Sequence, residues 1–316
     1  MKKLLKKIRL WSPVNIPVRS LFRAFGNFSR RINAFFSLHW PVSGNVSFRL
    51  PGGETAQLYS KGDDYIPTQL YWKGYAGYEG ASVALFYELS KRSQCIIDIG
   101  ANIGFFSVVA GCANPNANIY AFEPVSFILE RLKKNALLNG LANVHAEQLA
   151  AGNKDENISF FLPEQEGIPF SGSAKKGWAE KTTEISVRSV RLDTFRSERQ
   201  TGKIDLVKMD CEFHEKEVLQ GMEQVLATDQ PLLLTEILFP ESDGVKGHFE
   251  NAEYLAIEQL LREAGYYFYL INATALVRVD RLEYNPDDRN YLFSPKKSSR
   301  VYLPYSDMAS LLNEIA

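Results

Sequence analysis

The stretch from Cys95 to Gly104 constrains the fold more than any other part of the chain. A short apolar run that contains Asp98 leads into a loop with two glycines and then into the apolar residues 105–110. An apolar run bounded by glycine is typical of a buried strand in a parallel sheet, and the next residues are typical of a helix that packs over it. Ligands of open α/β sheets bind outside the carboxyl ends of the strands. We therefore expect Asp98–Gly104 to lie at a ligand site.

Much of the chain alternates between apolar strands and amphipathic helices, which predicts a mainly parallel α/β sheet with helices on both faces. The expected strands are Cys95–Ile99, Ile119–Phe122, Val144–Leu149, Ile204–Met209, Pro231–Leu238, Tyr266–Ile271 and Tyr291–Phe293. The expected helices are Glu79–Arg92, Gly104–Cys112, Ser126–Leu138, Glu215–Leu226 and Ala252–Glu263.

One insertion, residues 155–192, breaks this alternation. Ile158–Leu162 and Glu184–Arg191 have the alternating pattern of antiparallel strands. The loop between them, Gly167–Lys181, is longer than ordinary connections, which favours a functional lid over a mobile surface loop.

The N-terminal part differs from the rest in charge. The net charge is −1, but residues 1–53 contain ten Lys and Arg and no acid, whereas the remaining residues carry 26 basic and 37 acidic side chains. Leu21/Phe22, Phe25 and Phe28 recur at helical spacing among arginines. Residues 1–40 are therefore either a basic amphipathic segment that lies on an anionic membrane or acidic partner, or a helix that covers the catalytic domain or a second subunit of a homo-oligomer. We expect no nucleic-acid partner, because the acidic body would repel it.

The remaining composition favours a cytoplasmic protein. The three cysteines, Cys95, Cys112 and Cys211, have no paired spacing, which fits a reducing compartment. No apolar run reaches the roughly 18 residues that span a membrane, and basic residues interrupt the N-terminus where a signal peptide would need an apolar core. Residues 1–40 could still hold the protein at the inner face of the membrane.

A small β- and aromatic-rich region, residues 41–78, is expected to separate this segment from a main domain over residues 79–316. Tyr65–Tyr78 is rich in Tyr, Trp and Gly. Aromatic side chains with polar tips suit a sugar or another ring-bearing substrate, but packing in the core or under a lid is favoured.

Carboxylates fall at the ends of successive expected strands: Asp98, Glu123 and Asp210, with Glu212 two residues later. Acids that converge on one sheet edge repel each other, so a ligand with hydroxyls, amines or positive charge would relieve the repulsion. Glu236 lies within an apolar strand and is expected to face the same site, because a lone buried charge is costly. No spacing among these residues requires a metal ion, and we assign no metal ligand.

The loop spacing favours S-adenosylmethionine over NAD. Glu123 follows Gly104 by 19 residues, close to where a Rossmann-type fold places the acid that binds ribose hydroxyls. The glycines have the spacing Gly100-x-x-x-Gly104 rather than G-x-G-x-x-G, and Asp98 would serve a pyrophosphate poorly. An amino-acid tail and a sulfonium suit this loop better.

Four ordered motifs together resemble the FkbM-type S-adenosylmethionine-dependent methyltransferases. They are DIGANIG from Asp98, AFEP from Ala121, NGLANV from Asn139 and IDLVKMDCEFHE from Ile204. The resemblance covers residues 79 to 295. It implies a class I methyltransferase (Rossmann-like) sheet of seven mostly parallel strands with the last antiparallel. It also implies O-methylation of a hydroxyl on a sugar, glycan, glycolipid or secondary metabolite.

The resemblance further assigns roles to residues. Asp98, Gly100, Asn102 and Gly104 would surround the methionine half of the cofactor, with Glu123 at the ribose and Asp210 beside them. Asp210, Glu212, His214 and Glu215 match the D-x-E-G-x-E block that faces the reacting groups.

Methyl transfer to an alcohol needs alignment and a base, and the candidate bases are His214, Glu212 and Asp210. His214, with an ordinary pKa near ~6.5, would be neutral at pH 7; alternatively it caps the next helix.

One departure from the family pattern keeps other functions open. Phe213 replaces the block's glycine, which would crowd the pocket or reshape the turn. A membrane-associated cofactor-binding pseudoenzyme is one alternative, motivated by Phe213 and the basic N-terminus. An NAD-type oxidoreductase is another, disfavoured by the glycine spacing.

Overall fold

A computed structural model describes residues 12–26, 36–164, 172–176, 181–238, 247–248, 252–284, 288–296, 298, 300 and 302–315. Its centre is a nine-stranded sheet with the strand order β16-β13-β12-β15-β10-β9-β3-β4-β5. The strands are β3 (Cys95–Ile99), β4 (Asn118–Phe122), β5 (Val144–Glu147), β9 (Leu206–Met209), β10 (Leu232–Glu236), β12 (Tyr267–Ile271), β13 (Ala275–Val279), β15 (Asn290–Ser294) and β16 (Tyr302–Pro304).

Five neighbouring strands, from β5 through β4, β3 and β9 to β10, are parallel, as the alternation of strands and helices predicts. β15 is antiparallel to both of its neighbours, β10 and β12. The expected count of seven strands is wrong, because β13 and β16 extend the sheet beyond β12. β16 has only three residues, too few to show a period in the sequence.

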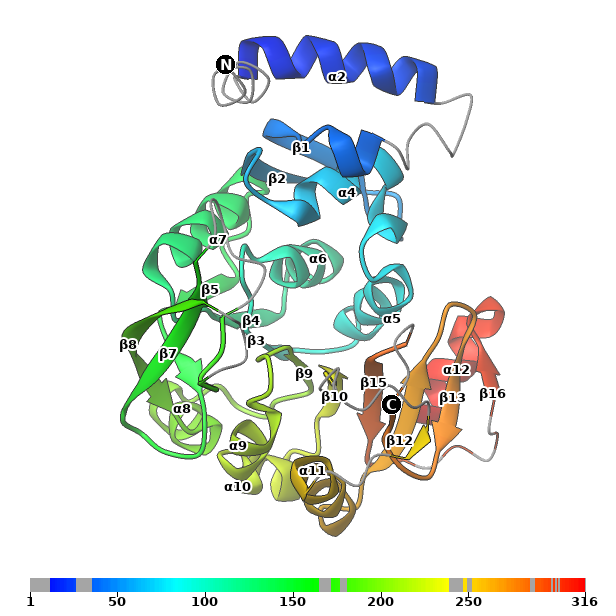
Figure 1. Cartoon of the computed structure of the whole chain (residues 1–316). Coiled ribbons are helices and arrows are strands. Elements are labelled where there is room, and N and C mark those ends of the chain that lie inside the picture. The colour runs from blue at the N-terminus through cyan, green and yellow to red at the C-terminus, as the bar shows by residue number, and fades with distance from the viewer. Residues whose placement is uncertain are drawn as a thin grey trace.

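Helices cover both faces of this sheet (Figure 1). One face carries α5 (Gly80–Ser90), α6 (Phe105–Ala113), α7 (Ser126–Leu138) and, near the C-terminus, α12 (Met308–Ile315). The other carries α8 (Leu192–Arg199), α9 (Glu215–Gln220), α10 (Glu223–Thr228) and α11 (Ala252–Glu263). Successive residues of β3 point to opposite faces, so Ile96 packs into the first core and Ile97 into the second.

The expected single helix Glu215–Leu226 is two helices, α9 and α10, which is a correction to the sequence analysis. Gly221 lies at the break, and a Cβ atom there would stand 1.9 Å from the carbonyl oxygen of Gly152. Close contact with β6 (Ala150–Ala151) and its following residue thus ends α9 where the helical pattern continues.

The insertion forms the expected antiparallel pair, β7 (Asn157–Pro163) and β8 (Thr182–Val190). Most of the loop Gly167–Lys181 lies outside the described residues. Within the part that is described, Ser173 Oγ donates a hydrogen bond of 2.5 Å to the carbonyl oxygen of Glu212.

A hairpin of β1 (Ser43–Arg49) and β2 (Thr55–Lys61) precedes the main sheet, followed by α4 (Tyr65–Lys73) and the short helix η1 (Tyr75–Gly77). Within the aromatic tract, Tyr71 and Trp72 of α4 are buried in a small core, as the packing interpretation expects.

The N-terminal helix α2 (Ser12–Gly26) lies over β1 (Figure 1). Arg19 Nη1 donates to the carbonyl oxygen of Ser43 at 2.7 Å. Asn15 Nδ2 donates to the carbonyl oxygen of Pro41, just before β1, and Asn15 Oδ1 accepts from the Ser43 amide, both at 3.0 Å. Leu21 is 58% exposed, while the side chains of Phe22, Phe25 and Phe28 lie outside the described residues. In the described residues, α2 therefore packs on the chain itself through Asn15 and Arg19. No helix in the described ranges is long and apolar enough to cross a membrane.

Candidate active site

The carboxyl ends of the parallel strands bring the expected acidic residues to one edge of the sheet. Asp98 and Lys208 are register partners on β3 and β9, and Asp210 directly follows β9. Glu123 directly follows β4. Glu236 ends β10. The side chains of Asp98 and Glu123 are buried.

The glycine loop after β3 is shaped by close approach to β9. Gly100 has φ +74°, and a Cβ atom there would lie 1.9 Å from the carbonyl oxygen of Asp210. Asn102 also has a positive φ, and its Oδ1 accepts a hydrogen bond from the Ile103 amide at 2.7 Å. Gly104, with φ +82°, is the residue before α6. The backbone therefore takes left-handed conformations at three positions within five residues, two of which need glycine's freedom.

A small cavity of about 30 Å³ lies against this loop. Four of the expected cofactor residues line it, Asp98, Gly100, Asn102 and Asp210. Lys208, Tyr78 and Phe105 are among the other residues of its wall. The structure thus brings these four residues together. Gly104 ends the same loop, and Glu123 accepts a hydrogen bond from the amide of Asn102 within it.

Glu123 is joined to the glycine loop by its carboxylate. Its Oε2 accepts from the Asn102 amide at 3.1 Å and its Oε1 from the Val125 amide at 2.8 Å. Burial nevertheless raises the pKa of Glu123 to about 7. Burial also raises the pKa of Asp98 to about 6, against the hydrogen bond that Ser107 Oγ donates to it at 2.5 Å. Hydrogen bonds thus hold both carboxyl groups in place, but they do not fully offset the cost of burying a negative charge, and the pKa of each acid stays raised.

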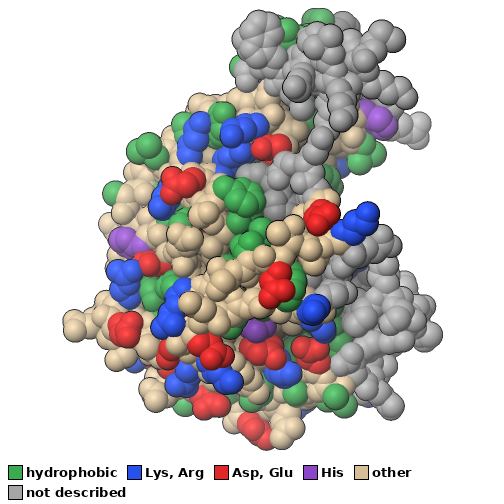
Figure 2. All heavy atoms as spheres, turned by 60° about the vertical axis from the view of Figure 1, so that its left-hand side comes forward, with side chains coloured by type: hydrophobic (Ala, Val, Ile, Leu, Met, Phe, Trp, Pro, Cys, Tyr) green, Lys and Arg blue, Asp and Glu red, His purple; other side chains and the backbone are tan. Residues whose placement is uncertain are grey.

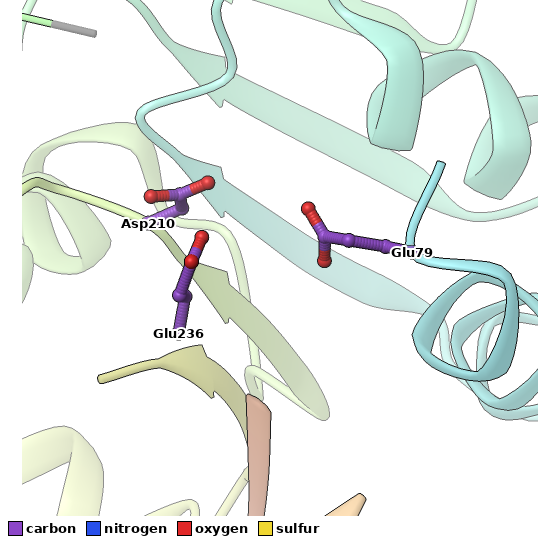
Figure 3. Close-up of side chains that lie close together, drawn as sticks. All are labelled: Glu79, Asp210 and Glu236. Carbon is purple, nitrogen blue, oxygen red and sulfur yellow. The ribbon is translucent and has the colours of Figure 1, made fainter. Parts of the chain in front are cut away.

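Three carboxylates meet beside this cavity, from Glu79, Asp210 and Glu236 (Figure 3). One oxygen of each lies within 4.8 Å of the others. The buried ammonium of Lys208 is 3.8 Å from Asp210 Oδ2 and has no hydrogen-bond partner among the described residues. This carboxylate cluster, as we call these three residues, therefore carries more negative charge than its lysine neutralises.

The charges of the cluster change its proton affinities. Burial, then the negative charges of Asp210 and Glu79, raise the pKa of Glu236 to about 9. Burial also raises the pKa of Glu79, although Lys208 opposes this. Burial alone would lower the pKa of Lys208, but the neighbouring carboxylates outweigh it and raise that pKa. At pH 7 the cluster thus holds at least one proton that carboxylates in water would have lost.

The block after Asp210 turns sharply away from the cluster. Glu212 has φ +51° and Phe213 φ +70°, both left-handed. His214 precedes α9, and its Nδ1 lies 3.5 Å from Glu217 Oε2. Burial lowers the pKa of His214, with Glu217 opposing. A Cβ atom on Gly152 would lie 3.3 Å from His214 Nε2, which places the ring beside β6 rather than in the cluster.

Glu215 is buried on the first turn of α9. Its Oε1 accepts a hydrogen bond from Cys211 Sγ at 3.5 Å, and burial raises its pKa to about 7. Of the block's candidate residues, Asp210 alone belongs to the carboxylate cluster. Glu212 lies close enough for its charge to be a minor cause of the raised pKa of Glu236.

Sequence reasoning missed Glu79 and Lys208. Glu79 directly precedes α5, far from the strand-end motifs in the chain, and only the fold brings it to Asp210. Lys208 carried a usable signal, since a lysine inside an apolar strand two residues before an acid needs a buried anion as partner.

The comparison with known families agrees with this geometry. The model of the methyltransferase FkbM domain matches residues 98–268, which begin near the end of β3 and end in β12. The chain belongs to the FkbM methyltransferase domain family. Its α/β fold with a large mixed sheet is therefore that of a methyltransferase, as the resemblance implies.

Three curated relatives of this FkbM-domain protein are informative. Methyltransferase 1 of Beauveria bassiana is 26% identical over 220 residues, which cover 64% of this chain and 81% of that protein. Hexuronic acid methyltransferase AglP of Haloferax volcanii is 26% identical, covering 46% of this chain and 56% of AglP. The 2-O-methyltransferase NoeI of Sinorhizobium fredii is 27% identical, covering 44% of this chain and 61% of NoeI. The match thus spans less than two thirds of the latter two proteins.

Proposed function

We propose that this protein is an S-adenosylmethionine-dependent O-methyltransferase that acts on a hydroxyl of a sugar or another alcohol. The observation that carries the proposal is that the loop cavity and the carboxylate cluster meet at Asp210. This contact supports a cationic donor at the loop beside carboxylates that can take a proton from a hydroxyl.

The chemistry of the residues around the loop fits this cofactor, and because the cavity of about 30 Å³ holds little more than a water molecule, binding requires its wall to move. Asp98 and Asp210 offer negative charge to an amino group and a sulfonium, and the raised pKa of Asp98 shows that a cation there would be stabilising. Glu123 uses one lone pair of each oxygen on a backbone amide, which leaves others for ribose hydroxyls. Bound there, S-adenosylmethionine supplies a methyl group already activated by positive sulfur.

The carboxylate cluster is then the base that the reaction needs. An alcohol is a weak nucleophile, and removing its proton as the new bond forms contributes to the rate. We assign this proton to the cluster, with Asp210 and Glu236 as the acceptors and Lys208 as the fixed counter-charge. A cation at the loop lowers the pKa of Glu236 and so prepares it to accept a proton. His214 and Glu212 become positioning residues for the turn that follows Asp210.

Two relatives support the acceptor class. NoeI is named a 2-O-methyltransferase and AglP a hexuronic acid methyltransferase. A hydroxyl-bearing glycan or metabolite is accordingly the acceptor that we propose here.

The test is turnover of deuteriomethyl-labelled cofactor with a panel of sugars and alcohols, read by mass spectrometry. We expect label on oxygen of at least one acceptor. Glu236→Gln should lower kcat about 100-fold or more, as expected when a general base is lost, and it should leave S-adenosylhomocysteine binding intact. His214→Gln should lower kcat far less. Cofactor binding without labelling of any acceptor would favour the pseudoenzyme instead.

A further inference from the structure

One segment beside the cofactor loop is held less firmly than its surroundings. It consists of residues 74–80, between α4 and α5, and it includes η1; we call it the strap. The helix before it, α4, is buried from Ile66 to Trp72, and most of α5 is buried as well. Every residue of the strap, in contrast, is half-buried or exposed. Movement of the strap therefore disturbs the core less than movement of either helix.

The strap covers the cofactor loop with Tyr78. This side chain lines the loop cavity, and its ring packs edge to face on that of Phe105, with 5.8 Å between ring centres. The loop itself is fixed, because the amides of Gly100 and Ala101 both donate to the carbonyl oxygen of Phe122. Small-molecule sites measure roughly 300–1,000 Å³, whereas this cavity measures about 30 Å³. Tyr78 is accordingly the wall residue that has to move to admit a cofactor.

The other side of the strap faces open space. A second cavity, of about 650 Å³, extends from the strap to the turn between β12 and β13. Four strap residues line it: Tyr75, Ala76, Glu79 and Gly80. The strap thus separates a small cavity at the loop from a large one behind it, and the large one gives it room to swing away from the loop.

Backbone geometry marks Gly74 as a hinge. Its φ of 71° and ψ of −168° lie in a region that is almost exclusive to glycine. A Cβ atom there would meet no atom within 4 Å, so the backbone rather than packing requires glycine. The Gly74 amide donates to the carbonyl oxygen of Leu70 at 2.9 Å, and the Gly77 amide donates to that of Gly74 at 3.0 Å, so both bonds are local. At the other end, Glu79 has φ +44°, a left-handed conformation that is costly for a residue with a side chain.

The closed strap also places Glu79 in the carboxylate cluster. The side chain extends from the strap toward Asp210 and Glu236 (Figure 3). Burial raises the pKa of Glu79, and the negative charge of Asp210 adds to this effect while Lys208 opposes it. A positive charge beside Asp210 relieves the repulsion. The closed strap therefore suits a sulfonium donor better than the neutral thioether that remains after the methyl group has left.

From this arrangement we infer that the strap is a gate, which turns at Gly74 and Glu79 into the larger cavity to admit the methyl donor and to release the product. It closes more firmly over the sulfonium than over the thioether, because a ligand shifts such an equilibrium by its differential affinity for the two states. The identity of the ligand rests on the proposed methyl transfer, whereas the hinge motion does not.

Surface plasmon resonance with S-adenosylhomocysteine and the full chain tests the gate. Gly74→Ala destabilises the closed strap with and without ligand, so the association and dissociation rate constants should both rise about tenfold while Kd stays nearly unchanged. The matched Gly53→Ala, at the turn between β1 and β2, has φ +96° and equally open surroundings, and it should change neither rate. Ala273→Trp fills the larger cavity from the wall opposite the strap and should slow both rates, whereas Ala309→Trp, exposed on α12, should not.

Hydrogen exchange, followed by mass spectrometry on peptides that span the strap, measures the motion without any ligand. Relative to wild type, exchange should be about tenfold faster in Gly74→Ala, slower in Ala273→Trp and unchanged in Gly53→Ala. S-adenosylmethionine should slow exchange in the wild type more than S-adenosylhomocysteine does, and Glu79→Gln should reduce this difference.

Equal strap exchange in ligand-free wild type, Gly74→Ala and Ala273→Trp would overturn the gate, as would a changed Kd in Gly74→Ala without a joint rise of both rate constants. Equal protection of the strap by the two ligands would overturn the preference for the sulfonium. If strap exchange responds to the variants but folded protein binds neither ligand, the hinge motion stands and the proposed function is wrong.

Discussion

At the scale of single residues, the site holds conformations that folding alone disfavours. Glu79, Glu212 and Phe213 are non-glycine residues with positive φ, a conformation that costs about 1–2 kcal/mol at each position. Phe213 adopts the left-handed backbone that the family glycine would favour, and Lys175 Nζ lies 5.0 Å from the centre of its ring. Phe213 thus takes a backbone conformation that ordinarily favours glycine, and it does not line the loop cavity.

The raised pKa of Glu236 predicts a pH dependence of stability. Between its ordinary pKa of 4.5 and about 9, the unfolded chain loses this proton while the folded chain keeps it. The free energy of unfolding therefore falls as pH rises through this window. Glu236→Gln removes the effect, so the variant should gain stability relative to wild type, by about 1 kcal/mol or more between pH 5 and 8.5.

Urea unfolding at several pH values measures this, with Glu130→Gln on the exposed face of α7 as the control. Parallel pH profiles for wild type and Glu236→Gln would show that Glu236 is not destabilised in the fold.

At the scale of elements, the parallel strands and their acidic ends could be predicted because each strand is an apolar run that ends at a polar residue. Asp98, Glu123 and Asp210 were found in this way. Glu79 could not be found, because it precedes a helix rather than following a strand. The direction of His214 also could not be read from spacing, since two left-handed residues before it reverse the chain.

The loop between β3 and α6 gives an element-scale prediction. Gly202, which lies outside this loop, serves as the control. A Cβ atom there would meet no atom within 4 Å, but the residue has φ +78°, so Gly202→Ala should lower the free energy of unfolding only by the cost of the left-handed conformation, about 1–2 kcal/mol. Gly100→Ala has a similar φ and also drives Cβ into the Asp210 carbonyl. It should cost clearly more in denaturant unfolding and should weaken S-adenosylhomocysteine binding. Equal losses in the two variants would mean that the contact between loop and β9 is not tight.

At the scale of the whole molecule, charge divides the sequence into a basic N-terminal part and an acidic remainder. Over the face in Figure 2, Lys and Arg side chains are interspersed with Asp and Glu among the described residues. The basic excess of residues 1–53 thus stands apart from a mixed surface.

The membrane interpretation of residues 1–40 predicts salt-sensitive binding to anionic vesicles. Charge reversal of Lys2, Lys3, Lys6 and Lys7 to glutamate should abolish flotation with vesicles that contain phosphatidylserine. Reversal of four exposed lysines elsewhere, Lys91, Lys133, Lys154 and Lys203, serves as the control. If both variants float like wild type, the segment is a packing or subunit contact instead.

Calorimetric titration of S-adenosylhomocysteine into the 316-residue chain tests the central claim most directly. We expect saturable binding that Glu123→Ala weakens about tenfold or more, a loss of about 1.4 kcal/mol or greater, and that Glu130→Ala leaves unchanged. The absence of binding by folded wild-type protein would contradict the assignment of the strand edge as a methyl-donor site.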